Sequence, residues 1–445
     1  MPKITFLGAG STVFAKNILG DVLLTPALRD SHIALYDIDP VRLKESEVVV
    51  TTLNNNLNSG KAHVSTHLGV SQRREALRAA DYVVNAIQVG GYKPAGLTDF
   101  EVPKKYGLRQ TIGDTLGIGG IFRGLRTIPV MLDIADDMRE VCPDAWLLNY
   151  TNPMAMVTGA VLRFGGIKCV GLCHSIQVLA PTILKEVGMF DQIKNLRWEA
   201  AGINHQAWLL SVRDGEVDLY PEIKRRAAEI NRKARLPGEP KHNDMVRFEM
   251  MRHFGYYFTE SSEHSSEYVP YWIKSKYPEL ITEFNIPLDE YPRRNEKRIA
   301  AWKEMSKALV QNPELDHRRT EEYGSFIMEA IENNAPIRIH GNVTNTSLLT
   351  NLPNSACVEV PCLVDGNGVQ GCYVGDLPEQ CAALNRTNIN VQLITVDAAV
   401  TRSRERVYQA AMLDPHCGSE LTLDEIRSLC DDLFEAHGNL IPTFS

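Results

Sequence analysis

The sequence lacks several features that would assign it to particular classes of protein. Its longest apolar runs, such as Val157–Leu162, are far shorter than the ~20 residues that cross a bilayer, so we expect no membrane-spanning segment. Basic residues are not in excess, because 47 Lys and Arg stand against 55 Asp and Glu, for a net charge of −8. That balance argues against a nucleic-acid partner and against an anionic membrane surface.

Cysteine is present, but not in the pattern of a disulfide framework. The nine cysteines are odd in number and scattered over 445 residues, which indicates reduced thiols. The N-terminal segment has the pattern of a strand from Ile4 onward, so we expect no signal peptide. These features together predict a cytoplasmic protein.

What the first part of the chain does contain is an alternation of short apolar runs and helical patterns, which is typical of a parallel sheet. We expect its strands at Ile4–Leu7, Ile33–Tyr36, Tyr82–Ile87, Trp146–Leu148 and Cys169–Leu172. From about residue 196, charged helical segments alternate with polar stretches, and strands follow around 335–342 and 357–364. Since a single core rarely serves so long a chain, we predict an α/β protein with two domains. Residues 1–195 form a Rossmann-like parallel-sheet domain, and residues 196–445 form a mixed α+β domain.

A candidate dinucleotide site lies at the end of the first predicted strand. Gly8 and Gly10 stand where the strand turns into a helix, and glycine there lets backbone N–H groups approach a pyrophosphate. The third glycine of the usual fingerprint is replaced by Val13. Asp37 closes the second strand, where a carboxylate accepts from a ribose hydroxyl, and no arginine adjoins it. This pattern indicates NAD rather than NADP.

Two residues that could hold a metal follow later in the chain. Cys173 ends a predicted strand, at the edge where open α/β sheets place ligands, and His205 comes about thirty residues later. A thiolate and an imidazole suit a divalent transition metal that acts as a Lewis acid. On spacing alone, the alternative that both side chains are simply packed in the core stays open. His174 and the adjacent Tyr256 and Tyr257 are candidates for proton transfer, although neighbouring tyrosines commonly serve packing.

Taken together, these segments resemble the NAD-dependent family 4 glycoside hydrolases, whose N-terminal domain is similar to that of lactate and malate dehydrogenases. The resemblance runs along nearly the whole chain, and Val13 belongs to the family pattern. Its motifs are Gly8-Ala9-Gly10-Ser11, Asn85-Ala86-Ile87-Gln88-Val89-Gly90-Gly91, Gly113-Asp114-Thr115-Leu116-Gly117-Ile118-Gly119-Gly120, Leu148-Asn149-Tyr150-Thr151-Asn152-Pro153, Cys173-His174-Ser175, Gly202-Ile203-Asn204-His205 and Asn351-Leu352-Pro353.

The resemblance also implies a substrate class. Within the family, Cys173-His174-Ser175 is the version associated with α-galactosidases, closest to the melibiose type. The phosphate-binding arginine of the 6-phosphoglycosidases is missing, because the chain has no arginine between Ile87 and Leu108. The implied activity is hydrolysis of non-phosphorylated α-galactosides, with an α-glucuronidase or α-glucosidase of the same family as the alternative. A lactate/malate-type dehydrogenase and a non-catalytic NAD-binding protein are further alternatives from other classes.

Family 4 enzymes use NAD and a divalent metal, commonly Mn²⁺, and are an exception to the two-carboxylate mechanism of glycosidases. The implied chemistry is oxidation at C3 of the sugar, deprotonation at C2, elimination of the leaving group and addition of water. The resemblance further implies a sugar as the partner and a homodimer or homotetramer as the assembly. The residue roles that it implies are Cys173 and His205 as metal ligands; Gly8, Gly10, Ser11, Thr12, Asp37, Asn85 and Gln88 as cofactor contacts; Asn152 and Asp114 as substrate contacts; Tyr256, or alternatively Tyr257, as the C2 base; and His174 as the acid for the leaving group.

Overall fold

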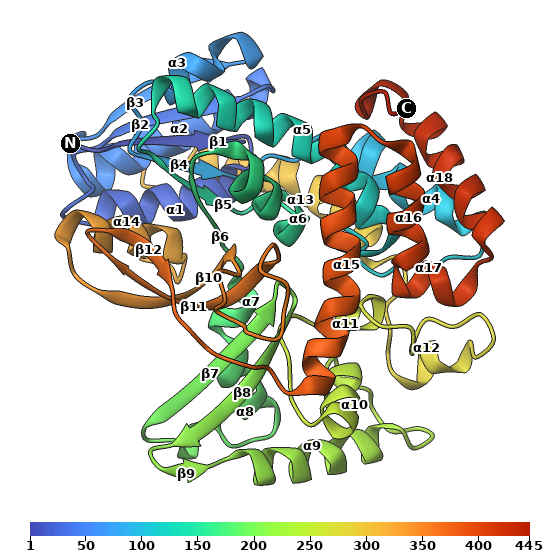
Figure 1. Ribbon diagram of the computed structural model, residues 1–445. Helices are drawn as coiled ribbons and strands as arrows, with labels where there is room; N and C mark the ends of the chain where they lie inside the picture. Colours follow the sequence, from blue (N-terminus) through green and yellow to red (C-terminus); the bar gives the residue numbers. More distant parts are fainter.

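One continuous β-sheet organises the protein (Figure 1). The structure, a computed structural model, describes residues 1–445 apart from the side chain of Lys303. The first part of the sheet is parallel, with strands in the order β3-β2-β1-β4-β5-β6. This is the 3-2-1-4-5-6 order of a Rossmann fold, so the predicted fold class of this part is confirmed. Its strands are β1 (Lys3–Leu7), β2 (His32–Asp37), β3 (His63–Leu68), β4 (Tyr82–Asn85), β5 (Trp146–Asn149) and β6 (Lys168–Gly171).

The sequence did not predict the edge strand β3. Its residues include His63, Ser65, Thr66 and His67, and they are exposed or only half-buried. An edge strand that faces solvent needs no apolar run, so the pattern that marks the buried strands is missing here. The strand expected over 82–87 ends earlier, at Asn85.

The second half of the chain joins the same sheet. Strand β10 pairs with β6 in antiparallel orientation through Asn342 and Gly171, and β11, β7, β8 and β9 follow in that order. The predicted mixed α+β character of this half is therefore confirmed, while the domain boundary at residue 195 stays a prediction. The strands are β7 (Leu196–Ile203), β8 (Gln206–Asp214), β9 (Val217–Asp218), β10 (Ile337–Thr344), β11 (Cys357–Asp365) and β12 (Gly368–Gly371).

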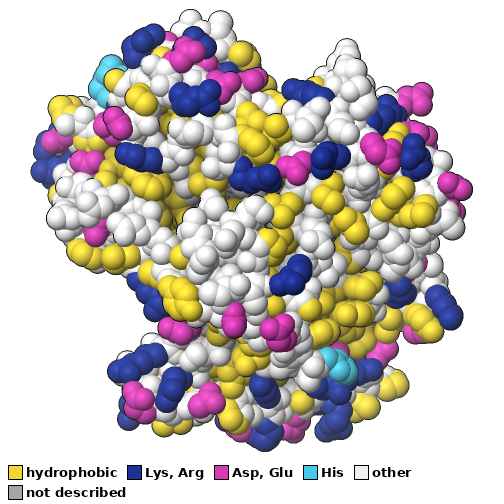
Figure 2. Space-filling view, in the orientation of Figure 1, with side chains coloured by type: hydrophobic (Ala, Val, Ile, Leu, Met, Phe, Trp, Pro, Cys, Tyr) yellow, Lys and Arg dark blue, Asp and Glu magenta, His cyan; other side chains and the backbone are white. Residues whose placement is uncertain are grey.

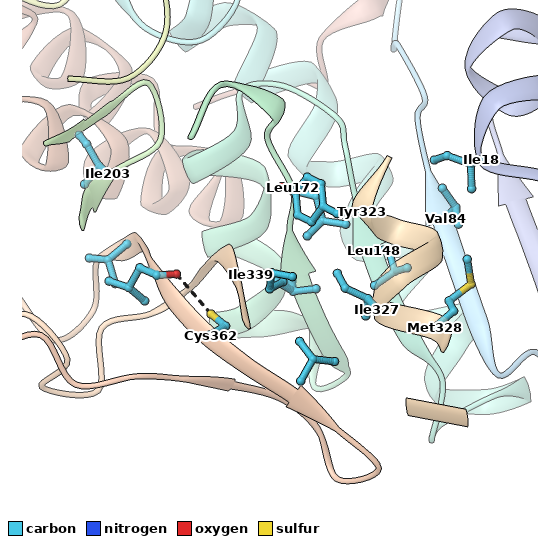
Figure 3. Packing of buried hydrophobic residues seen from close by; sticks show 14 of the residues in the cluster. Ile18, Val84, Leu148, Leu172, Ile203, Tyr323, Ile327, Met328, Ile339 and Cys362 are labelled. Carbon is cyan, nitrogen blue, oxygen red and sulfur yellow. Dashed lines mark hydrogen bonds between the residues drawn. The ribbon is translucent and has the colours of Figure 1, made fainter. Parts of the chain in front are cut away.

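Helices cover both faces of the parallel strands, and alternation along each strand decides which side chain meets which face. Val84 packs on one face with Ile18 and Met328, as Figure 3 shows, whereas its neighbour Val83 packs on the other face with Leu125. The helices of the first face are α1 (Thr12–Leu24), α2 (Pro40–Asn58) and α14 (Tyr323–Asn333), and those of the second are α5 (Gly117–Val141), α6 (Met154–Ala160) and α15 (Glu379–Thr401).

The remaining helices extend the molecule at two ends (Figure 1). Helices α16 to α18 stand beside α15, and α8 to α10 lie against the β7–β8 hairpin. Their bounds, with those of the connecting helices, are α3 (Arg73–Leu77), α4 (Leu97–Lys104), α7 (His174–Gln177), α8 (Leu179–Glu186), α9 (Tyr220–Ala234), α10 (Met245–Phe254), α11 (Ser262–Glu267), α12 (Glu279–Glu283), α13 (Glu290–Val310), α16 (Arg404–Leu413), α17 (Pro415–Glu420) and α18 (Leu423–His437).

The face shown in Figure 2 carries basic and acidic side chains interspersed with one another. Among the residues that the structure describes, no helix is both long and apolar enough to span a bilayer.

Candidate active site

A cavity of about 380 Å³ opens beyond the carboxyl ends of β4, β5 and β6. This is the edge at which open α/β sheets bind their ligands. Of the residues predicted to form a site, those that line the cavity are Gln88, Asn152, Cys173, His174 and His205. Segments more than a hundred residues apart in sequence therefore meet at one place.

The glycine turn before α1 has the geometry that close backbone approach requires. Gly8 has a φ of +84°, and a Cβ on it would lie 2.7 Å from the carbonyl oxygen of Ala86. The N–H of Gly10 donates to Asp37 Oδ2 at 2.6 Å, so the acidic residue at the end of β2 lies directly beside the turn. Ser11 precedes α1 without a side-chain cap, and the buried hydroxyl of Thr12 contacts Ser46. A turn with two glycines, an uncapped helix start and an adjacent carboxylate fit a dinucleotide.

Asn85 lies beneath the cavity rather than on its wall. It is buried and donates to Asn149 Oδ1 at 2.8 Å and to Thr151 Oγ1 at 3.0 Å. Thr151 itself lines the cavity. Asn85 therefore supports the loop after β5, and direct contact with a cofactor stays a prediction.

Cys173 and His205 reach the cavity from different parts of the sheet. Cys173 follows β6 and precedes α7, whereas His205 lies in the two-residue connection between β7 and β8, with a φ of +62°. Burial, followed by the nearby carboxylates of Glu359 and Glu260, raises the pKa of the Cys173 thiol.

The pair fits a divalent metal that keeps open positions for a ligand. In the described part of the chain, the buried Nδ1 of His205 has no hydrogen-bond partner. No group of three or more His, Cys, Asp and Glu side chains lies close enough to hold an ion, as far as the structure describes them. Two protein ligands would leave the remaining positions to substrate oxygens or water.

His174 faces the same cavity and is paired with an acid that sequence reasoning did not identify. Its Nε2 lies 2.5 Å from Glu322 Oε2, and its ring contacts Phe14, Tyr150 and Tyr323. The hydrogen bond to Glu322 raises the pKa of His174 against the effect of burial. The pairing favours the protonated imidazole, which is the form that donates a proton.

Tyr256 and Tyr257 are not among the residues that line the cavity, so the geometry gives no support to the prediction that one of them is the base. Tyr257 is completely buried in the cluster formed by α8, α9, α10 and the β7–β8 hairpin, and its hydroxyl donates to Asp244. Burial raises the pKa of Tyr257 well above its usual value. Tyr256 is half-buried and packs against Tyr220. Two adjacent aromatic residues served packing here, the alternative noted for such pairs.

Glu260 and His264, a few residues further along, line the cavity instead. Glu260 has a φ of +72°, and its Oε1 lies 3.6 Å from His264 Nε2. The rings of His264 and His205 lie 4.5 Å apart. Burial alone would raise the pKa of the Glu260 carboxyl, but His205, His264 and Arg247 lower it. The polar run from Thr259 to Glu267 in the sequence was the signal that could have pointed to these residues.

Three further residues of the cavity wall, Gln88, Arg123 and Asn152, belong to a small polar network that also includes Asp114 and Tyr291. Asn152 Nδ2 donates to Asp114 Oδ2 at 3.3 Å, and Arg123 Nη1 lies 3.6 Å from the same oxygen. Arg123 also donates to the carbonyl of Asn152 and to the hydroxyl of Tyr291. Gln88 donates to Tyr291 from the other side. Carboxylate, amide and guanidinium groups in this arrangement can bind the hydroxyl groups of a polar ligand.

Comparison with known proteins gives matches over both halves of the chain. The profile of the family 4 glycosyl hydrolases matches residues 3–189, and that of the family 4 glycosyl hydrolase C-terminal domain matches residues 200–417. An α-galactosidase from Bacillus subtilis is 58% identical over 444 residues, which cover 100% of both chains. An α-galactosidase from Rhizobium meliloti is 34% identical, and the aligned region covers 100% of this chain and 90% of the Rhizobium protein.

Solved structures agree in fold. A Bacillus subtilis protein named as a glucosidase superposes with a TM-score of 0.84 at 26% identity, covering 97% of this chain and 99% of its own. A 6-phospho-α-glucosidase from gut microorganisms, solved in complex with NAD and Mn²⁺, superposes with a TM-score of 0.81 at 22% identity and covers 100% of both chains.

Proposed function

This chain belongs to family 4 of the glycosyl hydrolases, and we propose that it is an α-galactosidase that acts on non-phosphorylated α-galactosides. The observation that carries the proposal is the meeting of Cys173 and His205 around one cavity, whose wall includes Ala86, the residue against which Gly8 of the glycine turn packs. The two α-galactosidases that are 58% and 34% identical over the whole chain support the sugar. The absence of an arginine between Ile87 and Leu108 supports a sugar without phosphate, since a guanidinium fork is the usual phosphate ligand.

We propose NAD and a divalent metal, with Mn²⁺ the first choice, as the cofactors. When bound, NAD would supply reversible hydride transfer at C3 of the sugar, and the metal would supply Lewis-acid polarisation of sugar oxygens. Gly8, Gly10 and Asp37 would hold the dinucleotide, with Ser11, Thr12, Asn85 and Gln88 around it. Cys173 and His205 would hold the metal.

Proton transfer is assigned to two residues on the cavity wall. Glu260 is proposed to take the proton from C2, because it is half-buried on the wall that it shares with Cys173 and His205 and its carboxyl favours the ionised form. His174 is proposed to protonate the oxygen of the leaving group, because Glu322 stabilises its imidazolium form. Asn152 and Asp114 are proposed to bind hydroxyl groups of the sugar.

An α-glucosidase or an α-glucuronidase of the same family remains the alternative for the sugar. The alternative that the chain is a lactate/malate-type dehydrogenase has no support, because both halves of the chain match a glycosyl hydrolase family. A location in the cytoplasm and assembly into a homodimer or homotetramer are proposed with the function, as is the division into domains at residue 195.

The test is chromophore release from an aryl α-galactoside with reductant and Mn²⁺, with and without NAD, on enzyme stripped of bound cofactor. Release that requires NAD without net NADH supports the proposal. Equal release with and without NAD would overturn the mechanism. Absence of release, with release from an aryl α-glucoside or α-glucuronide, would move the substrate to that sugar.

A further inference from the structure

Four residues that are paired directly with one another on adjacent strands form a row across the sheet, just behind the cavity. Gly171 on β6 pairs with Asn342 on β10, Asn342 pairs with Glu359 on β11, and Glu359 pairs with Gly202 on β7. The row begins two residues before Cys173 and ends three residues before His205. The two residues proposed as metal ligands therefore stand at the two ends of a short span, and Glu359 lies within it.

The carboxylate of Glu359 connects both ends of this row by hydrogen bonds. Its Oε1 accepts from Asn342 Nδ2 at 2.9 Å and from Asn204 Nδ2 at 3.4 Å. Asn342 Nδ2 also donates to the carbonyl of Gly171 at 3.2 Å, on the strand that leads to Cys173. Asn204 is the immediate neighbour of His205 in the tight connection between β7 and β8. One oxygen atom thus links the strand before Cys173 to the turn that holds His205.

This carboxylate is costly to bury, so packing alone does not account for it. Glu359 is completely buried, and its hydrogen-bond partners in the described part of the chain are neutral amides. Its second oxygen, Oε2, is buried without a partner among the described residues. A buried acid without a cationic partner destabilises a fold, and an amide or apolar side chain would fill the position at less cost. Such a group is expected where charge or fixed geometry serves a neighbouring site.

We propose that Glu359 is the positioning residue of the metal site, which sets the separation and orientation of Cys173 and His205. The inference rests on the proposed function, since it assumes that these two residues bind the metal. Glu359 Oε2 and His205 Nδ1 are both buried without a hydrogen-bond partner among the described residues. Carboxylates behind metal-ligating histidines typically change metal affinity 10- to 100-fold when they are removed, about the effect expected here.

The test measures metal binding directly, on the full-length protein without substrate. Glu359→Gln keeps the size of the side chain and removes its charge. Mn²⁺ affinity is measured from the loss of the free-ion EPR signal, and Co²⁺ is then added as a probe whose thiolate charge-transfer band reports bonding to Cys173. The matched control is Asp414→Asn, because Asp414 is equally buried, accepts from Cys417 N–H at the start of α17 and lies outside the cavity wall.

We expect Glu359→Gln to weaken Mn²⁺ binding by about 10- to 100-fold and to shift or weaken the Co²⁺ band, while Asp414→Asn leaves both unchanged. Unchanged Mn²⁺ affinity in Glu359→Gln, with only a lower melting temperature, would overturn the inference. If Glu359→Gln does not fold, Asn204→Ser is the alternative variant, because it removes only the link to the His205 turn. It should weaken Mn²⁺ binding several-fold. Unaltered Mn²⁺ binding in Asn204→Ser would also overturn the inference.

Two variants separate this inference from the proposed function. Cys173→Ser should abolish the charge-transfer band and lower Mn²⁺ affinity more than Glu359→Gln does. If the unmodified protein binds neither ion, or Cys173→Ser binds both as before, the proposed metal site is wrong and the inference falls with it. If Cys173→Ser loses binding but Glu359→Gln does not, the metal site stands and only the inference is wrong.

Discussion

The hydroxyl of Tyr257 donates a hydrogen bond of 2.5 Å to Asp244 Oδ2 in the interior of the protein. The same Asp244 accepts from Arg247 Nε at 2.6 Å, and the Arg247 guanidinium lies 4.5 Å from the centre of the Tyr257 ring. Tyrosine, carboxylate and guanidinium therefore satisfy one another away from the cavity. This arrangement assigns Tyr257 to the stability of the fold.

We expect Tyr257→Phe to lower the free energy of unfolding by about 1.5–3 kcal/mol, because a buried hydrogen bond to a charged group is lost. Tyr256→Phe should have little effect on stability, since its ring is only half-buried. Urea unfolding measures both. A loss of activity in Tyr256→Phe at unchanged stability would instead restore that tyrosine as a candidate base.

Glu260→Gln should lower kcat by about 10²- to 10⁴-fold, the usual effect of removing a general base. The fold should persist, because glutamine has the same shape as the glutamate that it replaces. Exchange of the C2 proton of the sugar with solvent deuterium should fall together with kcat. The matched control is Glu263→Gln, on the same segment but bonded to Arg294 at the surface; an equal loss in that variant would contradict the specific role of Glu260.

Gly10→Ala should raise the Kd for NAD by at least about 10-fold. A Cβ at this position would lie 2.8 Å from Asp37 Oδ2, so the carboxylate and the turn must move apart. Isothermal titration with NAD measures the effect. Gly418→Ala, on α17, is the control and should bind NAD normally.

Cys173 should make the enzyme sensitive to oxidation. Cys173 and Cys372 are the two half-buried thiols that the structure describes, the other cysteines being buried. Activity should fall in air and recover with a thiol reductant, because a sulfur that loses its thiolate form cannot bind the metal. Cys372→Ser should show the same oxygen sensitivity as the unmodified enzyme. A Cys372→Ser enzyme that resists air would place the sensitive thiol elsewhere.

Glu267 should make stability depend on pH. Its Oε1 accepts from the N–H groups of Thr111, Ile112 and Gly113 at 2.6, 3.1 and 3.1 Å, yet burial raises the pKa of its carboxyl to about 7. Between its ordinary pKa of 4.5 and about 7, the folded state holds a proton that the unfolded state has lost, so stability falls as pH rises through this window.

The decrease in the free energy of unfolding that Glu267 causes between these pH values is at most about 3 kcal/mol. In Glu267→Gln this component should be absent, so the difference in unfolding free energy between the variant and the unmodified protein should change between pH 5 and pH 7.5. Urea titrations at both pH values measure that difference. A constant difference would show that the carboxyl of Glu267 does not titrate in this range.

Some of the candidate site followed from local sequence patterns. A strand that ends in glycine and is followed by a helix predicts a turn for a dinucleotide, and Asp37 at the end of the next strand adds to it, because both signals are local in sequence. Glu260 and His264 were missed, because the polar run around them marks candidate residues but does not show that their segment folds back against His205. Tyr256 and Tyr257 were chosen from residue type, whereas burial decides whether a phenol reaches a ligand.

The sequence by itself determined the parallel-sheet character of the first half, the glycine turn and the family, since hydrophobic periodicity and ordered motifs are written along the chain. Only the tertiary structure decided which side chains share the cavity. Pairings such as His174 with Glu322, or Glu359 with Asn204 and Asn342, join residues separated by 148, 155 and 17 positions. They depend on how β6, β10, β11 and β7 lie side by side in one sheet, and no local propensity specifies that order.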